Sequence, residues 1–240
     1  MKKLPTAVIQ MNAGPYKEVN IENASRLISR ASRNGARLVA LPELFNWRGN
    51  KKGIAKNSEP LSGFTFRKMA DLASSLNIFL LCGSILEVNP RSKRPFNTSL
   101  LLSPQGELIA QYRKIHLFKF KSPGKTLIDE QSLYSPGKVA KTATTPFAAV
   151  GLTICYDLRF PVWSRNIKSD LYDLVFYVAN WPEVRVSAWS SLLRARAVEN
   201  ASYCIGLNRI GEDGKGLKYN GQSAAYDHLG NALLEAKDSE

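Results

Sequence analysis

Hydrophobic residues along the first third of the chain follow two different periods. Short apolar runs at residues 6–12, 37–43 and 77–88 predict buried strands. Between these runs, residues 16–36 and 64–76 carry apolar side chains at helical spacing, which predicts two helices. Strands that alternate with helices in this way favour a layered α/β fold.

The rest of the chain continues this alternation and adds antiparallel hairpins. Residues 96–117 and 221–236 each hold two apolar segments separated by turn residues, which predicts two hairpins. Further strands are predicted at residues 147–155, 172–181 and 202–211, and helices at residues 161–169 and 184–201. The pattern contains no repeat and no linker, so we expect one domain over residues 1–240.

The composition fits a globular protein. Hydrophobic residues make up 44% of the 240 residues, which is enough for a sizeable core. No apolar run approaches the ~20 residues that span a bilayer, and the opening MKKLPTAVIQMNAG predicts a strand rather than a signal peptide. We therefore expect a cytoplasmic protein with no membrane partner.

The chain is strongly basic, with a net charge of +13 from 33 Lys and Arg against 20 Asp and Glu. Such an excess is typical of nucleic-acid-binding proteins, but no helix-turn-helix, zinc-finger or RNA-recognition spacing is present. We expect no nucleic-acid partner. One basic cluster stands apart, because residues 112–125, YRKIHLFKFKSPGK, contain no acidic residue.

Three cysteines, Cys82, Cys155 and Cys204, lie far apart in the sequence, which argues against a disulfide framework or a zinc site. Cys82 and Cys204 lie inside apolar strands and are interpreted as core residues. Cys155 instead ends a predicted strand, where α/β proteins place their sites, and a predicted helix begins shortly after it. Its position leaves two interpretations open, a packed thiol and a nucleophile.

A cysteine nucleophile needs a base, and several residues could serve. His116 and His228 would give the Cys–His arrangement of cysteine proteases, and His116 is the better placed because it lies in the basic cluster. Glu43 ends the strand 37–43 among apolar neighbours, where burial would raise the pKa of a carboxyl group toward that of a general base. Lys114 also ends a strand, but a lone lysine is more often a surface residue. The residues by themselves leave these choices open.

Three segments together resemble the nitrilase superfamily of carbon–nitrogen hydrolases: LPELF around Glu43, YRKIHLF around Lys114 and ICYDLRFP around Cys155. Their order and spacing are also similar to that family. A second glutamate of the family usually precedes a Ser-Pro-Gly, and IDEQSLYSPG places Glu130 there. The resemblance covers nearly the whole chain, and the half that follows Cys155 is most similar to the bacterial omega-amidase, or 2-oxoglutaramate amidase, branch.

The resemblance implies a four-layer α-β-β-α sandwich. Two such subunits usually pair through helices next to the nucleophile, and residues 161–169 and 184–201 are the candidates, so we expect a homodimer or a higher homo-oligomer. Members of the family usually continue past the last strand with a further strand and a tail. This sequence stops at Glu240, so the expected domain lacks the usual C-terminal tail.

The resemblance also implies a mechanism that needs no metal and no organic cofactor. Cys155 attacks an amide carbonyl and Glu43 transfers the proton to the leaving ammonia. Lys114 and the backbone N–H of Tyr156 stabilise the oxyanion, and Glu130 holds Lys114. The cysteine thioester is then hydrolysed to a carboxylate.

The omega-amidase branch implies a small omega-amide substrate of the 2-oxoglutaramate or 2-oxosuccinamate type. The expected substrate-binding residues are Tyr156, Arg159, Asn180, Trp181 and Phe118. Arg159 either grips the far carboxylate of the substrate or forms an ion pair with Asp157, and the residues favour the ion pair slightly. Three alternatives stay open: an amidase for deaminated glutathione, a nitrilase or N-carbamoyl hydrolase with the same site, and a basic binding module that only keeps the fold.

Overall fold

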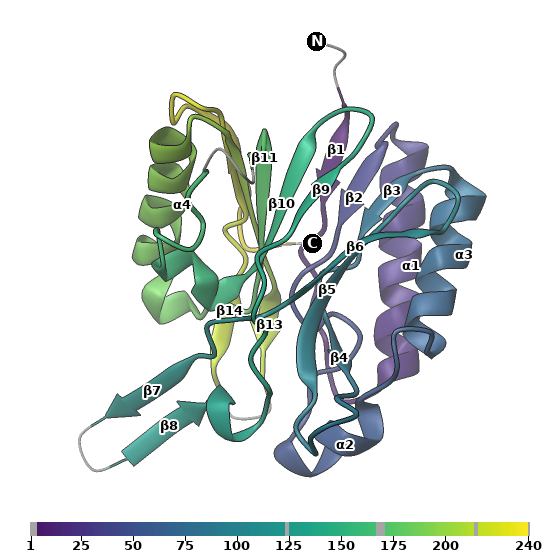
Figure 1. Cartoon of the computed structure of the whole chain (residues 1–240), viewed down its shortest axis with the longest axis vertical. Coiled ribbons are helices and arrows are strands. Elements are labelled where there is room, and N and C mark those ends of the chain that lie inside the picture. The colour runs from purple at the N-terminus through teal and green to yellow at the C-terminus, as the bar shows by residue number, and fades with distance from the viewer. Residues whose placement is uncertain (1–3, 123–124, 167–170, 214–215, 240) are drawn as a thin grey trace.

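The chain folds into four layers, shown in Figure 1. The computed structural model describes residues 4–122, 125–166, 171–213 and 216–239. Two six-stranded sheets face each other at the centre of the molecule. Helices α1 (Lys17–Arg33) and α3 (Phe64–Leu76) cover the outer face of one sheet, and α4 (Val186–Asn200) covers the outer face of the other. The predicted α-β-β-α sandwich is confirmed.

The first half of the chain builds one sheet. Its strands are β1 (Thr6–Val8), β2 (Leu38–Ala40), β3 (Phe79–Leu81), β4 (Ile85–Glu87), β5 (Phe96–Leu102) and β6 (Leu108–Arg113). Strands β1, β2 and β3 are parallel neighbours, and β5 runs antiparallel to β3, β4 and β6. The apolar faces of α1 and α3 pack on β2, β3 and β5, so the helical spacing read from the sequence is the buried face of each helix.

The second half of the chain builds the other sheet. Its strands are β9 (Thr142–Thr144), β10 (Ala149–Ile154), β11 (Leu174–Ala179), β12 (Tyr203–Asn208), β15 (Ala224–Tyr226) and β16 (Ala232–Glu235). The central strands β10, β11 and β12 are parallel and in register, with Ile154 opposite Val178 and Ala179 opposite Asn208. Because parallel strands end at the same edge, the residues that follow β10 and β11 meet there.

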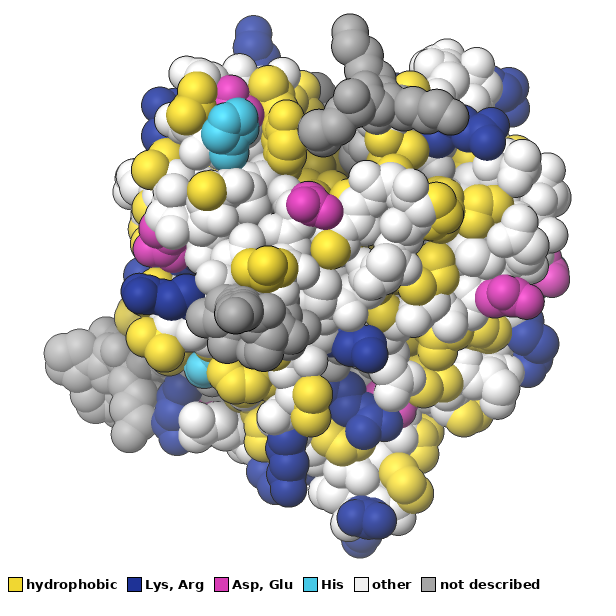
Figure 2. Space-filling view, turned by 45° about the horizontal axis from the view of Figure 1, so that its top comes forward, with side chains coloured by type: hydrophobic (Ala, Val, Ile, Leu, Met, Phe, Trp, Pro, Cys, Tyr) yellow, Lys and Arg dark blue, Asp and Glu magenta, His cyan; other side chains and the backbone are white. Residues whose placement is uncertain are grey.

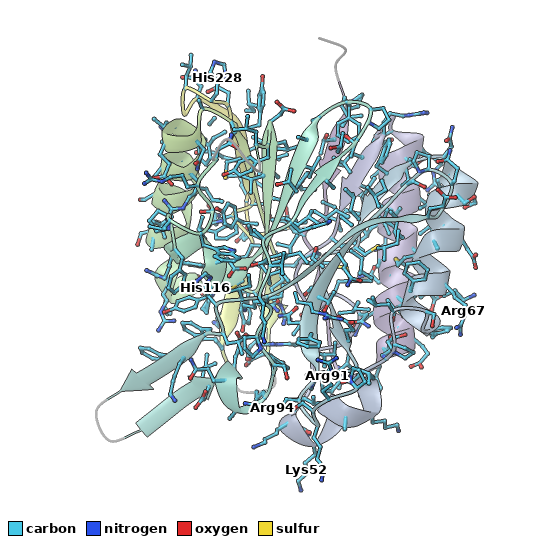
Figure 3. All side chains as sticks on the ribbon, in the orientation of Figure 1. Lys52, Arg67, Arg91, Arg94, His116 and His228 are labelled. Carbon is cyan, nitrogen blue, oxygen red and sulfur yellow. The ribbon has the colours of Figure 1, made fainter. Side chains whose placement is uncertain are left out.

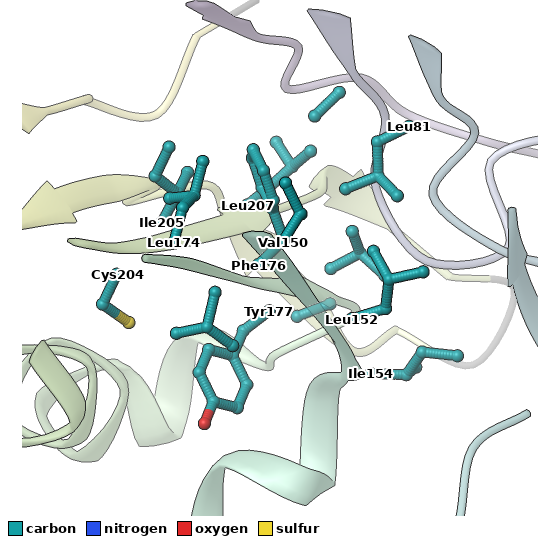
Figure 4. Packing of buried hydrophobic residues seen from close by; sticks show 14 of the residues in the cluster. Leu81, Val150, Leu152, Ile154, Leu174, Phe176, Tyr177, Cys204, Ile205 and Leu207 are labelled. Carbon is teal, nitrogen blue, oxygen red and sulfur yellow. The ribbon is translucent and has the colours of Figure 1, made fainter. Parts of the chain in front are cut away.

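The sheets are held together by a core of aliphatic and aromatic side chains. Leu81 and Leu101 of the first sheet belong to the same buried cluster as Val150, Leu152 and Phe176 of the second, and Figure 4 shows part of this packing. Burial of such side chains stabilises the fold by roughly 1.5–3 kcal/mol each. The rigid sandwich that results fixes the strand ends that carry the site.

Several short elements were missing from the prediction. A hairpin of β7 (Lys119–Ser122) and β8 (Lys125–Asp129) projects from the body in Figure 1, and β13 (Ile210–Glu212) pairs with β14 (Lys218–Asn220). The helix α2 and the short 3-10 turns complete the described elements, with α2 at Ile54–Asn57, η1 at Lys51–Gly53, η2 at Glu130–Ser132, η3 at Cys155–Arg159 and η4 at Glu183–Arg185.

Two predicted elements were wrong in form. The strand expected over residues 77–88 is split into β3 and β4 at Gly83, whose φ of 42° is left-handed. The helix expected over residues 161–169 is absent from its described part, 161–166, which forms turns, and the remainder lies outside the described residues. The side chain of Asn166 instead bonds to the backbone of Tyr172 and Asn200, which competes with helix formation.

Within the described ranges, no helix has the length and apolar character that a membrane crossing requires. Lys and Arg side chains are distributed over the face of the molecule shown in Figure 2, with Asp and Glu between them.

Candidate active site

A pocket at the carboxyl ends of β10 and β11 contains the predicted nucleophile. Its empty volume, counted together with the solvent space at its mouth, is about 470 Å³. Of the nine residues predicted for the site, all but Lys114 line this pocket. Lys114 is completely buried and contacts two of the lining carboxylates.

Cys155 follows β10 and begins the 3-10 turn η3, not a long helix. Its φ of 48° is left-handed, a conformation that costs a residue with a Cβ about 1 kcal/mol or more. The carboxylate of Asp157 fixes the turn by accepting a hydrogen bond from the Ile154 N–H at 3.0 Å. The sharp turn presents the thiol at the pocket wall, and only 8% of Cys155 is exposed.

Asp157 is buried and occupied by partners other than Arg159. One carboxylate oxygen accepts from the Tyr112 hydroxyl at 2.8 Å, and the other contacts Nδ1 of His116 at 2.7 Å. The His116 ring also stacks on Phe160, with ring centres 3.7 Å apart. His116 is therefore a structural partner of the η3 turn.

Neither histidine lines the pocket. His228 lies in the turn between β15 and β16, at the top of Figure 3, well away from His116. The Cys–His alternative therefore has no geometric support.

Glu43 follows β2, and neighbouring groups hold its loop in place. A Cβ on Gly83 would lie 1.9 Å from the Pro42 carbonyl oxygen, so glycine is required for this close approach. The Leu44 N–H donates to the Ser84 hydroxyl at 2.9 Å. The split between β3 and β4 thus positions the candidate base.

Three hydrogen bonds fix the Glu43 carboxylate, and a fourth donor would still fit. Its Oε1 accepts from Lys114 Nζ and from Asn97 Nδ2, each at 2.8 Å. Its Oε2 accepts from the backbone N–H of Asn180 at 2.8 Å. Within the described residues Oε2 accepts only this one bond, which leaves it able to take a proton from the pocket.

Lys114 joins two carboxylates that are far apart in sequence. Its Nζ lies 2.8 Å from Glu43 Oε1 and 2.9 Å from Glu130 Oε2. Glu130 is fixed in turn by the Phe118 N–H, which donates to Oε2 at 2.8 Å. A Cβ on Gly137 would lie 2.1 Å from the Arg113 carbonyl oxygen, so this glycine lets its loop approach the end of β6.

The charges in this cluster set its protonation. Burial raises the pKa of Glu43, but Lys114 and then Arg48 outweigh burial and hold that pKa below its usual value. Burial would lower the pKa of Lys114, yet Glu130 and Glu43 keep it well above normal. Burial, followed by the charge of Glu43, raises the pKa of Cys155. At neutral pH the site therefore holds a carboxylate, an ammonium and a thiol, and not a preformed thiolate.

Burial also raises the pKa of Glu130, against the opposing charge of Lys114 and with the added repulsion of Glu43. The two carboxylates thus differ, since Glu43 is the more readily ionised. A pair of titratable groups with separated pKa values is typical of acid–base sites.

Arg159 does not form the ion pair that the sequence slightly favoured. Its guanidinium lies 5.0 Å from the ring of Trp181, and within the described chain it has no carboxylate partner. The side-chain nitrogen of Asn180 is buried and has no hydrogen-bond partner among the described residues. Both groups are therefore available to a ligand in the pocket they line.

Sequence reasoning missed several residues of the pocket. Arg48, Tyr219 and Arg185 also line it, and the charge of Arg48 opposes the burial that raises the pKa of Tyr219. Arg48 follows Glu43 by five residues, and Arg185 follows the predicted Trp181 by four, so proximity in sequence was the one available signal. Asn208 was also missed, and its Oδ1 accepts from the Trp181 N–H at 2.7 Å.

Comparison with known proteins identifies the family of the chain. The sequence model of the family described as "Carbon-nitrogen hydrolase" matches residues 6–240. The chain belongs to the carbon–nitrogen hydrolase family. This carbon–nitrogen hydrolase is an enzyme that acts on non-peptide C–N bonds.

The relatives of this carbon–nitrogen hydrolase include omega-amidases. Human omega-amidase NIT2 is 32% identical over 245 residues, covering 100% of this chain and 87% of the human protein. Nitrilase homolog 2 of Dictyostelium discoideum is 33% identical, covering 84% of this chain and 62% of that protein.

Solved structures of this family have similar folds. A CN-hydrolase superfamily protein from Xanthomonas campestris, with an arsenic adduct in its active site, has a TM-score of 0.88 at 32% identity, covering 100% of this chain and 88% of that one. Nit3 of Saccharomyces cerevisiae, a nitrilase superfamily member, has a TM-score of 0.87 at 28% identity, covering 99% and 87%.

Proposed function

We propose that this enzyme is an amidase that hydrolyses a small omega-amide, of the 2-oxoglutaramate or 2-oxosuccinamate type, to a carboxylate and ammonia. The observation that carries the proposal is the buried Lys114 ammonium, held between Glu43 and Glu130 beside a pocket that presents Cys155. The four residues act as one unit, with Cys155 as nucleophile, Glu43 as base, Lys114 as electrophilic donor and Glu130 as the residue that positions Lys114.

Attack on the amide begins with a neutral thiol. Because the pKa of Cys155 is raised and that of Glu43 is lowered, the proton stays on the sulfur in the resting site, and it passes to Glu43 only as the sulfur–carbon bond forms. The charge that develops on the carbonyl oxygen is stabilised by Lys114 and by the backbone N–H of Tyr156. Lys114 Nζ donates to Glu43 Oε1 and contacts both oxygens of Glu130, and one of its three N–H groups turns to the oxyanion during the reaction.

Collapse of this intermediate releases ammonia. Glu43 returns its proton to the leaving nitrogen, the C–N bond breaks, and an acyl thioester remains on Cys155. Glu43 then removes a proton from water as the water attacks the thioester. The C–S bond breaks, the sulfur regains a proton, and the carboxylate product departs.

The pocket supports an amide with an anionic far end. Arg159 is a guanidinium without a protein carboxylate, and it suits a substrate carboxylate. The unpartnered Asn180 Nδ2 supplies a further donor to a polar substrate. Phe118, Tyr156 and Trp181 form aromatic walls, and Phe118 meets Tyr156 edge-to-face at 4.9 Å.

We also propose that residues 1–240 act as a single domain and pair as a homodimer through α4. Two exposed apolar side chains support the pairing, Val198 within α4 and Val184 just before it, which are 53% and 80% exposed. Light scattering tests it, and a monomer at micromolar concentration would reject the dimer. A cytoplasmic location stays a prediction.

Ammonia release from 2-oxoglutaramate is the test of the proposed activity. Wild type should release ammonia, and Cys155→Ala should lose the activity while it keeps the circular dichroism of the wild type. Equal release by both proteins would reject the mechanism. A clear preference for deaminated glutathione, a nitrile or an N-carbamoyl compound would keep the site and replace the substrate.

A further inference from the structure

Two arginines lie at the pocket without an anionic partner. Arg159 ends the turn η3 that begins at the nucleophile, and Arg185 ends the turn η4 that precedes α4. Both line the pocket that holds Cys155. Within the described residues neither guanidinium forms an ion pair, and each packs on aromatic rings instead.

The aromatic contacts hold Arg185 in position without using its N–H groups. Its Cζ lies 4.1 Å from the ring centre of Phe120 and 5.1 Å from that of Phe118. A guanidinium stacked on a ring keeps its edge free for in-plane hydrogen bonds. The backbone of Arg185 is fixed as well, because its carbonyl oxygen accepts from Trp181 Nε1 at 2.8 Å. Arg185 is thus preorganised to bind an anion.

The two guanidiniums also repel each other. Burial and then the nearby positive charge of Arg159 lower the pKa of Arg185. Arg113 and Arg196 differ from them, because Arg113 pairs with Glu87 and Arg196 bonds to the Leu158 carbonyl and to Glu199. An anion bound between Arg159 and Arg185 would relieve their repulsion.

Among the described residues that line the pocket, no carboxylate is free to fill this position. Glu43 and Glu130 are both held by Lys114, and Asp157 is held by Tyr112 and His116. A ligand carboxylate would meet two guanidiniums that the carboxylates of the pocket leave unpaired.

We propose that Arg159 and Arg185 form a two-guanidinium clamp for the far carboxylate of the substrate, and that Arg185 determines the selection of anionic over neutral amides. The proposal rests on the amidase function proposed above and adds the residue that selects anionic amides at the same site. Two guanidiniums offer each carboxylate oxygen its own donors, a stronger arrangement than a single arginine provides. Arg185 is a specificity residue that does not take part in bond breaking.

A matched pair of amides isolates the carboxylate. Glutaramate and pentanamide share a five-carbon chain and differ only in a terminal carboxylate or methyl group. For Arg185→Gln, kcat/KM for glutaramate should fall ~10- to 100-fold, mainly through KM, as expected for lost charge-assisted hydrogen bonds. The value for pentanamide should change less than about twofold, because no carboxylate is present to use the clamp. Arg185→Lys should fall between wild type and Arg185→Gln, since it keeps the charge but not the fork.

Arg67→Gln is the matched control, because it removes an equal charge from an exposed position of α3, away from the pocket. It should leave both kcat/KM values unchanged. Equal losses on both amides in Arg185→Gln would mean a structural role, and no loss on glutaramate would mean no role; either result overturns the clamp.

A binding measurement separates the clamp from the amidase function. In the inactive Cys155→Ala background, calorimetry with glutarate should give a Kd ~10- to 100-fold weaker when Arg185→Gln is added. If wild type hydrolyses neither amide while this difference persists, the proposed function fails and the clamp stands. If wild type hydrolyses glutaramate but glutarate binds equally to both variants, the function stands and the clamp is rejected.

Discussion

Lys114 donates a hydrogen bond to Glu43 at 2.8 Å, and neither side chain has more than 1% of its surface exposed. Taking two charges out of water is costly, and attraction offsets the cost only when the remaining hydrogen-bonding groups are satisfied. Asn97, the Asn180 backbone and Glu130 provide these partners. The pair is therefore better explained by the chemistry it performs than by the stability it contributes.

Removal of Lys114 should destabilise the fold. Lys114→Met removes the ammonium that pairs with both buried glutamates, so the free energy of unfolding should fall by about 3–5 kcal/mol. Adding Glu43→Gln should recover part of this loss, because one of the two buried carboxylate charges disappears. Urea unfolding of the single and double variants measures both the loss and the recovery in the free energy of unfolding. Strictly additive losses would contradict direct coupling between the two side chains.

The two glutamates should differ in kinetics. Glu43→Gln removes the base, so kcat for 2-oxoglutaramate should fall ~100- to 10,000-fold. Glu130→Gln keeps an acceptor for the Phe118 N–H and affects the reaction only through Lys114, so its loss should be smaller, ~10-fold. Steady-state kinetics on both variants, with circular dichroism as a folding control, provides the comparison. A larger loss of kcat in Glu130→Gln than in Glu43→Gln would mean that Glu130, and not Glu43, is the base.

Arg48 should set the acid limit of activity. Burial raises the pKa of Glu43, whereas Lys114 and Arg48 lower it, so Arg48→Met should raise that pKa. Protonated Glu43 cannot accept the thiol proton, so the acid limb of the kcat/KM profile should move toward neutral pH. The exposed Arg67 is the control, and Arg67→Met should leave the limb in place. If the acid limb stays in place in Arg48→Met, Arg48 has no effect on the pKa of Glu43.

Cys155 should be a neutral thiol at neutral pH and not a preformed thiolate. Burial and the charge of Glu43 raise its pKa above the ordinary value, so alkylation by iodoacetamide should accelerate steadily from pH 6 to pH 9. Cys155→Ala reports any background from Cys82 and Cys204, which are both buried. A rate that is already high and constant at pH 6 would indicate a preformed thiolate.

Most of the site residues that the sequence could predict lie at the ends of strands. Glu43, Lys114 and Cys155 each follow or end a buried strand, and the sandwich brings those ends together. Periodicity also located α3 at Phe64–Leu76, because one face of the helix is buried along its whole length.

The other pocket residues and the region after Cys155 could not be predicted, because no periodic sequence pattern marks the contacts that position them. Arg48 and Arg185 lie in loops or turns, and Tyr219 reaches the pocket from a short hairpin that the prediction missed. The helix predicted after Cys155 failed because Asn166 bonds to distant backbone groups instead of allowing helical hydrogen bonds. Such partners become visible only once the fold is known.

In the proposed mechanism Cys155 carries the acyl group during turnover, and intact-protein mass spectrometry can detect that group on the protein. Wild type quenched in acid during hydrolysis of 2-oxoglutaramate should contain a species heavier by the 2-oxoglutaryl group, and peptide mapping should place that group on Cys155. Cys155→Ala should contain none. Rapid ammonia release with no adduct at any quench time, or an adduct on another residue, would contradict the thioester mechanism.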